Sequence, residues 1–375
     1  MQLALDSETF SELSLKAVGP YRYAEESEIM LVSHAIDDGP AEVMDLTDGD
    51  HDKKLRLVAE MAGDADDIII ANSMFDRTVF AAHGVTIPVE KITDTMVLGF
   101  LHGLPGGLDM QCEVLNVPTD KAKDKAGKRL VQLFCKPRPR NMVIRRATRD
   151  THPEDWAAFV EYARQDIPSM LAVFERMPKW NWTPEQRQLW ILDQRINDRG
   201  IKVDLDLAHA ALRAFDRSKL ALNARTAEIT EGDLKSLNQR DRFIEYADEQ
   251  GLKIPNMQKA TVEALLRSPD LSDDMRELLE IRQQAAAASP AKYRTAINAT
   301  CKDGRIRGMF QFAGASRTIR DAGRLLQVQN LPRPTIPPEE INMAIEAMKL
   351  DCEDLIYDDV AEICVNAVRG VLVAA

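Results

Sequence analysis

Three short clusters of polar and acidic residues, far apart in the chain, place the strongest constraint on how it can fold. They are Asp-Ser-Glu at residues 6–8, Asn-Ser-Met-Phe-Asp at residues 72–76 and Tyr-Ala-Arg-Gln-Asp at residues 162–166. Asp6 and Glu8 are two positions apart at the end of a predicted strand, so their side chains point to the same face. Neighbouring carboxylates repel each other unless a cation neutralises them, and a hard ion such as Mg²⁺ or Mn²⁺ is the natural partner. Taken alone, this cluster indicates either a metal site or an ordinary turn.

The second and third clusters each lie at a predicted helix. Asn72 follows a strand-like run and is placed to cap the next helix, with Asp76 in its first turn. Tyr162 and Asp166 are four positions apart, which puts the phenol and the carboxylate on one helix face. Each cluster also has an ordinary explanation, as a helix start or as a pair of residues facing solvent.

Apolar runs of strand length and helical patterns alternate in the first part of the chain. The runs predict strands at residues 2–6, 29–36, 41–46 and 68–71. Helical patterns follow at residues 51–63, 74–83, 95–102 and 153–177. This order predicts an α/β domain, and the proline- and tryptophan-rich break after residue 177 predicts its end.

The remainder of the sequence is mainly helical. Helices are predicted at residues 184–199, 205–230, 239–251, 259–267, 272–300, 338–349 and 356–368, and strands at 304–312 and 325–328. A chain of 375 residues also exceeds what one hydrophobic core usually serves. We therefore predict three domains, over residues 1–180, 181–300 and 301–375.

The charge is unevenly distributed. The chain carries a formal net charge of -12, yet the segment 121–149 is strongly basic. Its Lys and Arg residues are Lys121, Lys123, Lys125, Lys128, Arg129, Lys136, Arg138, Arg140, Arg145, Arg146 and Arg149, against the single acid Asp124. Such a segment is suited to bind phosphates. The alternative is a solvated basic loop.

Cysteine usage and hydropathy indicate the compartment. The five cysteines are scattered and form no CxxC pair, which argues against a disulfide framework and against a zinc site. No apolar run reaches the length of about eighteen residues that a membrane span needs, and no signal sequence is evident. We expect a cytoplasmic protein without membrane contact.

In this order, the three clusters resemble the exonuclease motifs of the DEDD superfamily, in the subgroup with tyrosine. The resemblance implies a ribonuclease-H-like (DnaQ-like) fold. It implies that Asp6, Glu8, Asp76 and Asp166 hold two divalent ions, Mg²⁺ or Mn²⁺, and that Tyr162 positions the attacking water. The implied reaction is hydrolysis of the 3'-terminal phosphodiester with release of a nucleoside 5'-monophosphate.

Residues near these motifs become secondary candidates. Asn72 would orient Asp76 or the substrate and bind DNA, and Asp94 would support the site. Phe10 and Phe75 could stack on terminal bases, although a core position is the alternative for both.

A segment near the C-terminus resembles the start of the palm of family A DNA polymerases, the group that contains bacterial DNA polymerase I. It comprises Arg-Thr-Ile-Arg at residues 317–320 and Gly-Arg-Leu-Leu-Gln-Val-Gln-Asn-Leu-Pro at residues 323–332. Ile319 stands where the family usually has glycine. In the family this segment contacts the primer-template duplex, which makes DNA-binding candidates of Arg317, Arg320, Arg324, Gln329 and Asn330. The alternative is a basic loop between strands.

Further segments are similar to phage-type members of the same family. They are residues 21–25 (Tyr-Arg-Tyr-Ala-Glu), residues 196–201 (Ile-Asn-Asp-Arg-Gly-Ile), and Lys292-Tyr293 with Arg282. The resemblance thus covers essentially the whole chain. It implies a helical thumb over residues 181–300, with weaker DNA-backbone candidates at Ser236, Asn238, Gln239 and Lys259, and a partial palm over residues 301–375.

The family's polymerase motifs, by contrast, do not occur in this sequence: the palm aspartate motif, the fingers lysine and the His-Asp-Glu-like motif are all missing. We therefore expect a 3'-5' DNA exonuclease, the proofreading portion of a family A polymerase, that cannot polymerise alone and acts in a bacterial or phage-infected cytoplasm. Its expected partners are single-stranded 3' ends and primer-template DNA. One alternative is the N-terminal subunit of a split polymerase that assembles with a second chain. Another is an RNA exonuclease of the same superfamily, which the palm-like segment disfavours.

Overall fold

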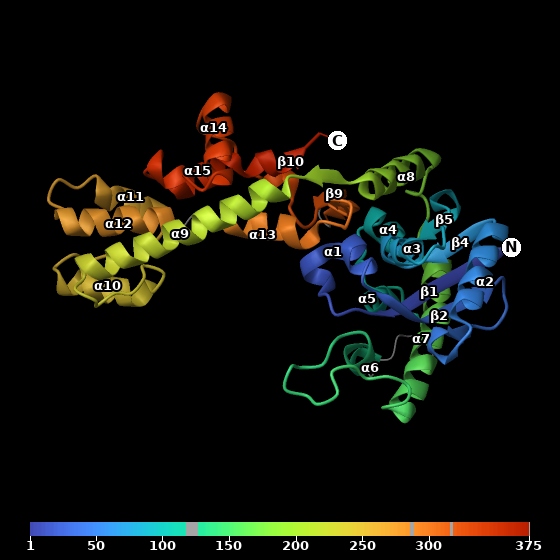
Figure 1. Ribbon diagram of the computed structural model, residues 1–375. Helices are drawn as coiled ribbons and strands as arrows, with labels where there is room; N and C mark the ends of the chain where they lie inside the picture. The colour runs from blue at the N-terminus through green and yellow to red at the C-terminus, as the bar shows by residue number, and fades with distance from the viewer. Residues whose placement is uncertain (118–126, 286–288, 316–317, 375) are drawn as a thin grey trace. The chain divides into compact units, whose positions relative to one another are not determined.

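A computed structural model describes residues 1–117, 127–285, 289–315 and 318–374 (Figure 1). The chain divides into two compact units. The first contains residues 1–200 and 299–328, and the second contains residues 201–298 and those from 329 onward. These boundaries differ from the predicted ones because residues 299–328 pack with the first unit. The assignment of exonuclease, thumb and palm domains stays a prediction.

The first unit is built on a mixed five-stranded sheet in the order β3-β2-β1-β4-β5. Its strands are β1 (Gln2–Phe10), β2 (Glu28–Ile36), β3 (Glu42–Asp45), β4 (Asp67–Ile70) and β5 (Ile92–Asp94). Strands β1, β4 and β5 are parallel, whereas β2 and β3 are antiparallel to their neighbours. The four predicted strands are confirmed, and so is the α/β class of this part. Strand β5 was not predicted, because three residues are too few to show a period.

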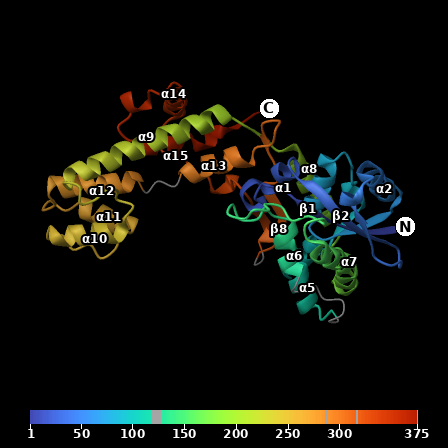
Figure 2. The same cartoon turned by 60° about the horizontal axis from the view of Figure 1, so that its bottom comes forward.

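Helices cover both faces of this sheet, which explains why its central strands are apolar runs rather than alternating ones. Leu3, Leu5 and Ile68 point to the face covered by α2 (His51–Asp64) and α3 (Ser73–Ala82). Ile69 points to the opposite face, where α7 (Pro153–Arg176) packs with Ile167 (Figure 2). The other helices of the unit are α1 (Leu15–Ala24), α4 (Thr95–Leu101), α5 (Leu108–Val114), α6 (Gly127–Phe134) and α8 (Pro184–Arg199).

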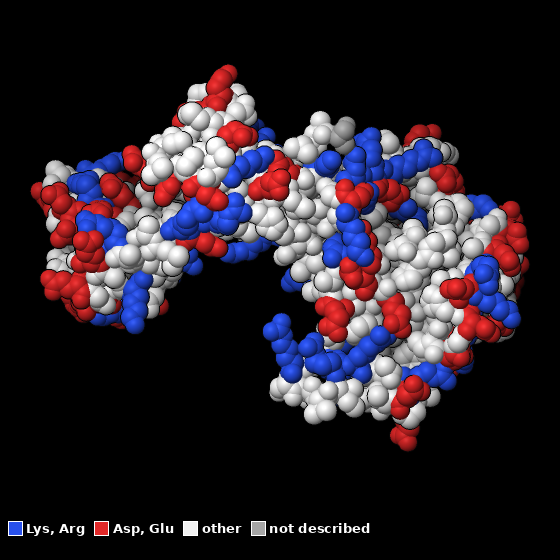
Figure 3. All heavy atoms as spheres, viewed as in Figure 1, with Lys and Arg blue, Asp and Glu red and all other residues white. Residues whose placement is uncertain are grey.

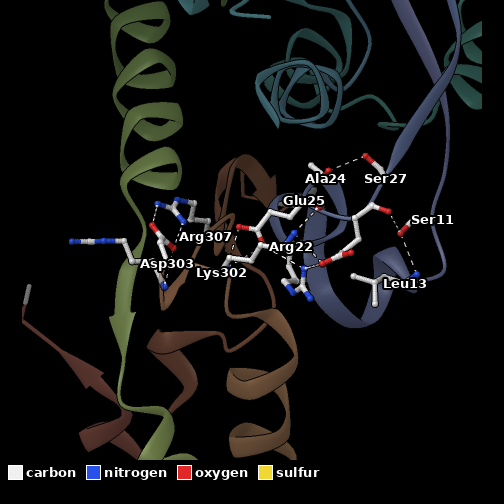
Figure 4. A network of polar contacts seen from close by, with 11 residues as sticks. Ser11, Leu13, Arg22, Ala24, Glu25, Ser27, Lys302, Asp303 and Arg307 are labelled. Atoms are coloured by element: carbon white, nitrogen blue, oxygen red, sulfur yellow. Dashed lines mark hydrogen bonds and ion pairs between the residues drawn. The ribbon is translucent and has the colours of Figure 1, made fainter. Parts of the chain in front are cut away.

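Residues 299–328 join the first unit through a hairpin and a polar network. The hairpin, β8 (Phe310–Ala315) with β9 (Arg320–Gly323), packs on α4 and α8, and it follows the short strand β7 (Arg305–Ile306). In the network, the backbone N–H of Lys302 donates to both carboxylate oxygens of Glu25 at 3.0 Å (Figure 4). The guanidinium of Arg307 donates to both oxygens of Asp303 at 2.8 and 2.7 Å.

The strands predicted in this region were partly wrong. The predicted strand 304–312 is interrupted, since β7 ends at Ile306 and β8 begins at Phe310. The predicted strand 325–328 does not form. Leu325 and Gln327 have φ values of 53° and 50°, in the left-handed region that a strand excludes, and a 3-10 turn follows at Val328–Asn330.

The second unit is mainly helical, as predicted. It contains β6 (Ile201–Val203), α9 (Leu205–Ile229), α10 (Arg240–Glu249), α11 (Lys259–Leu266), α12 (Asp273–Ala285), α13 (Ser289–Ala299), α14 (Pro338–Lys349), α15 (Val360–Ala367) and β10 (Leu372–Val373). Helix α9 packs against α12, α14 and α15. The predicted helix 272–300 comprises two described helices, α12 and α13. The last helix starts at Val360 instead of residue 356, because the carboxylate of Asp359 accepts a hydrogen bond from the N–H of Glu362 and caps it.

Two further properties follow from the described residues. Their helices include none with both the length and the apolar content needed to cross a membrane. The five cysteines are free thiols.

Candidate metal centre and adjoining cleft

Three of the predicted acids come together in the first unit. Asp6, Glu8 and Asp166 each place a carboxylate oxygen within 4.8 Å of the others. The two segments meet because α7 packs on β1. The sequence predicts Asp6 and Glu8 at the end of a strand, but they lie in the middle of β1. The strand continues to Phe10, paired with β2. They do lie beyond the part of β1 that pairs with β4, which stops at residue 4.

The fourth acid, Asp76, lies in the first turn of α3 and is buried. Its carboxylate accepts a hydrogen bond of 2.5 Å from the hydroxyl of Ser7, between the two acids of β1. Burial, and then repulsion from the carboxylate of Asp6, hold the pKa of Asp76 well above its usual range. Asp76 is thus next to these three acids, although it is not one of the residues whose carboxylate oxygens all lie within 4.8 Å of one another. An all-oxygen set of acids in repulsion fits a hard divalent cation such as Mg²⁺ or Mn²⁺.

Tyr162 lies on α7, one turn before Asp166, and is buried. Its ring is parallel to that of Phe159, with centroids 6.4 Å apart and planes 9° apart. Gly127, at the start of α6, lies directly against this ring, because a Cβ atom added there would overlap Tyr162 Cε2. This contact could not be predicted from the local sequence, since a glycine next to a basic run looks like a loop residue.

Gly127→Ala is therefore expected to displace the ring of Tyr162. The rate of the expected exonuclease reaction should fall by about 100-fold, which is the cost of misplacing a positioning group by about 1 Å. The rate is measured on labelled single-stranded DNA. Gly63→Ala on α2 is the control, because a Cβ atom meets nothing within 4 Å there. Equal rates in the two variants would show that the contact has no role.

A cleft of about 650 Å³ adjoins the acids at Glu8. Lys16, Phe75 and Lys136 are among its lining residues, and so is Cys135. The thiol of Cys135 lies 3.4 Å from Glu8 Oε2 and donates a hydrogen bond to it. Burial, followed by the nearby charge of Glu8, raises the pKa of this thiol. The scattered cysteines showed no pattern that singled out Cys135, so its contact with a predicted metal ligand was not foreseen.

The predicted basic segment 121–149 divides into two groups in the structure. Five of its residues form ion pairs with acids of the same unit: Lys128 with Asp109, Arg129 with Asp155, Arg145 with Glu12, Arg146 with Glu28, and Arg149 with Asp45. Lys136, Arg138 and Arg140 form no such pair with a described residue. Lys121, Lys123, Asp124 and Lys125 lie outside the described residues. Figure 3 shows basic side chains gathered over the segment that joins α6 to α7.

The secondary candidates beside the acids take different positions. Asn72 precedes α3 with a φ of 62°, but its side chain makes no cap, contrary to the prediction. The buried carboxylate of Asp94 accepts instead from the N–H of Asn72 and from Ser73, and it also caps α4. Phe10 is buried in the core below the guanidinium of Arg146, 4.2 Å from its ring centroid. Phe75 is half-buried in the cleft wall.

The palm-like residues belong to both units. Arg317 lies outside the described residues. Arg320 and Arg324 are exposed on the first unit, whereas Gln329 and Asn330 are exposed in the second. Ile319, in place of the family's glycine, has a φ of 53°, a region that glycine enters at little cost and a β-branched residue rarely occupies.

The weaker thumb candidates lie in the second unit. Ser236, Asn238 and Gln239 precede α10, and Lys259 begins α11.

Comparison with known proteins supports the resemblance read from the motifs. No family model matches the chain. A DNA polymerase of Bacillus phage SP02 is 34% identical over 376 residues, covering 98% of this chain and 57% of the phage protein. The chain therefore spans a little over half the length of this relative.

Similarity of fold points in the same direction. The polymerase domain of Pol1 from M. smegmatis, solved in complex with DNA primer-template and dNTP, matches with a TM-score of 0.54 and 14% identity, over 89% of this chain and 52% of that one. At this identity the match shows the fold alone. Together with the phage relative, it confirms that the chain resembles the phage-type DNA polymerases of family A.

Proposed function

We propose that the chain is the proofreading portion of a family A DNA polymerase, a metal-dependent 3'-5' DNA exonuclease. The observation that carries the proposal is the convergence of Asp6, Glu8 and Asp166, with Asp76 beside them, from three segments far apart in sequence. The order β3-β2-β1-β4-β5, with one antiparallel pair on each side of β2, supports a ribonuclease-H-like fold.

Each residue has a role in this proposal. The four acids hold two divalent cations, Mg²⁺ or Mn²⁺, which when bound activate a water and neutralise charge on the departing oxygen. Tyr162, held between Phe159 and Gly127, orients the attacking water. Lys16 and Lys136 attract the phosphates of the strand that enters the cleft.

The test uses single-stranded DNA labelled at its 5' end. The chain is expected to shorten this strand stepwise from the 3' end with Mg²⁺ or Mn²⁺, to release nucleoside 5'-monophosphates, and to stop when the metal is chelated. A strand with a blocked 3' terminus is the control and should stay intact. Cleavage that persists in excess chelator, or that proceeds from the 5' end, would contradict the proposal.

The palm-like segment is proposed to contact primer-template DNA in the whole polymerase. The residues concerned are Arg317, Arg320, Arg324, Gln329 and Asn330, with the helical residues 181–300 as the thumb and residues 301–375 as a part of the palm. Arginine suits phosphate contacts, and amide side chains suit the minor-groove acceptors common to all base pairs.

Assembly with a second chain that carries the polymerase motifs is a second candidate function. It is favoured by large apolar side chains exposed near α14, with Leu350 exposed by 74% and Leu355 by 84%. Polymerisation on a primer-template should then appear only after a polypeptide with the missing motifs is added. This polymerisation should be weaker when Leu355 is replaced by Ser. Equal polymerisation with and without the chain would exclude this role.

A further inference from the structure

The first unit contains a second cavity, separate from the metal centre. Its volume is about 340 Å³, within the range of roughly 300–1,000 Å³ typical of small-ligand sites. It lies between α1, the start of α4, α8 and the β8–β9 hairpin. Leu15, Lys16 and Phe75 line both this cavity and the cleft beside Glu8, so the two spaces share one wall.

The cavity combines flat apolar walls with free amide groups. Phe75 and Phe310, both half-buried, are among its lining side chains, as aromatic contacts for a planar ring. The side chain of Asn72 forms no hydrogen bond with a described residue. Among the residues that the structure describes, the side-chain amide of Gln311 has one weak polar contact, at 3.9 Å from the sulfur of Met96. Such amides can recognise the edge of a nucleobase.

The charge of the lining residues favours an anion. Lys16 and Arg324 both line the cavity, and neither forms an ion pair with an acid in the part of the chain that the structure describes. The lining also includes the carboxylate of Asp94, but both its oxygens already accept hydrogen bonds, from Ser73 and from the N–H groups that begin α4. These N–H and O–H donors offset part of the negative potential that the carboxylate presents to a bound phosphate.

We propose that this cavity binds a nucleoside 5'-monophosphate, with the base between the aromatic side chains and the phosphate at Lys16 and Arg324. This inference rests on the proposed function, because such a nucleotide is what the neighbouring exonuclease centre releases. It adds a second site that holds the product away from the four acids. An internal nucleotide of a DNA strand is the competing occupant, and the experiment below distinguishes it from a free mononucleotide.

The experiment measures binding of thymidine 5'-monophosphate to the full chain by titration calorimetry, in chelator, with Asp6 and Glu8 both replaced by Ala. Saturable binding is expected under these conditions, because the cavity needs neither metal nor the acids. Arg324→Gln should weaken binding roughly 10- to 100-fold, the range for loss of a charge-assisted hydrogen bond. Thymidine and inorganic phosphate, each with half of the contacts, should both bind more weakly than the nucleotide.

Arg56→Gln is the matched control, since Arg56 is an exposed arginine of α2 in the same unit and does not line the cavity. It should leave binding unchanged. Absence of saturable binding, or equal losses in the two arginine variants, would overturn the proposal. The proposal would also be overturned if a short oligothymidylate bound in a way that depends on Arg324 while the mononucleotide did not bind. The titration measures binding and not cleavage, so its result can be interpreted even if the chain shows no exonuclease activity.

Discussion

Replacing Asp6 and Glu8 together by alanine is expected to lower the exonuclease rate by at least about 1,000-fold. These two residues and Asp166 form the group of oxygens within 4.8 Å, and two of the three ligands are lost. Metal ions contribute several kcal/mol to transition-state stabilisation in phosphodiester cleavage, and each 1.36 kcal/mol is a factor of ten in rate. Initial rates on labelled single-stranded DNA at saturating Mg²⁺ measure the effect.

Stability provides a second readout for the same variant. The acids repel one another without metal, and Asp6 raises the pKa of Asp76. Their removal should therefore leave the metal-free fold at least as stable as before. Glu12→Ala is the control, because Glu12 lines the cleft but belongs to an exposed pair with Arg145. It should change the rate only a few-fold at most. Full activity in the double variant would disprove the assignment of the site.

Asp198→Ala is expected to destabilise the first unit by roughly 3 kcal/mol, the lower end for a broken buried ion pair. The guanidinium of Arg77, only 10% exposed, donates to the two oxygens of Asp198 at 2.7 and 2.9 Å. The hydroxyl of Tyr21 donates to the same carboxylate at 2.5 Å. Removing Asp198 leaves a buried cation and a buried hydroxyl without this partner. The lower end applies because Asp198 itself is 38% exposed.

Urea unfolding followed by tryptophan fluorescence measures this effect, because all four tryptophans belong to the first unit. Glu161→Ala is the control, since it removes a pair with Arg164 in which both side chains are largely exposed. Its cost should stay below about 0.5 kcal/mol. Replacing Arg77 by Met together with Asp198→Leu should recover part of the loss, because no charge then remains buried. Equal midpoints for Asp198→Ala and Glu161→Ala would contradict the role given to this pair.

Patterns that extend over many residues predicted the fold well. The central strands are buried on both faces, so their apolar runs were visible without any tertiary information. The three-and-four spacing predicted α7 to within one residue of its end. Short or kinked elements were missed. Helix α1 bends at Gly19–Pro20, and α5 and α6 are seven and eight residues long, which is too short for a clear helical period.

The candidate site was predicted in its acids but not in their surroundings. Asp166 and Tyr162 share a helix face, so their spacing already placed them together. Gly127 and Cys135 touch Tyr162 and Glu8 only because α6 and the residues after it fold back over α7 and β1. No local pattern marks such contacts, since they depend on the packing of segments far apart in the chain.

Local sequence was enough to predict which residues can hold a cation and which segments become strands and helices, because these depend on local chemistry and on periods of two and 3.6 residues. Tertiary structure alone decided the rest. It placed Asp76 against Ser7, bound residues 299–328 to the first unit, and created a cavity lined by Lys16 and Arg324. The physical reason is that burial, charge repulsion and cavity shape arise between segments distant in sequence, and only the packed chain brings those segments together.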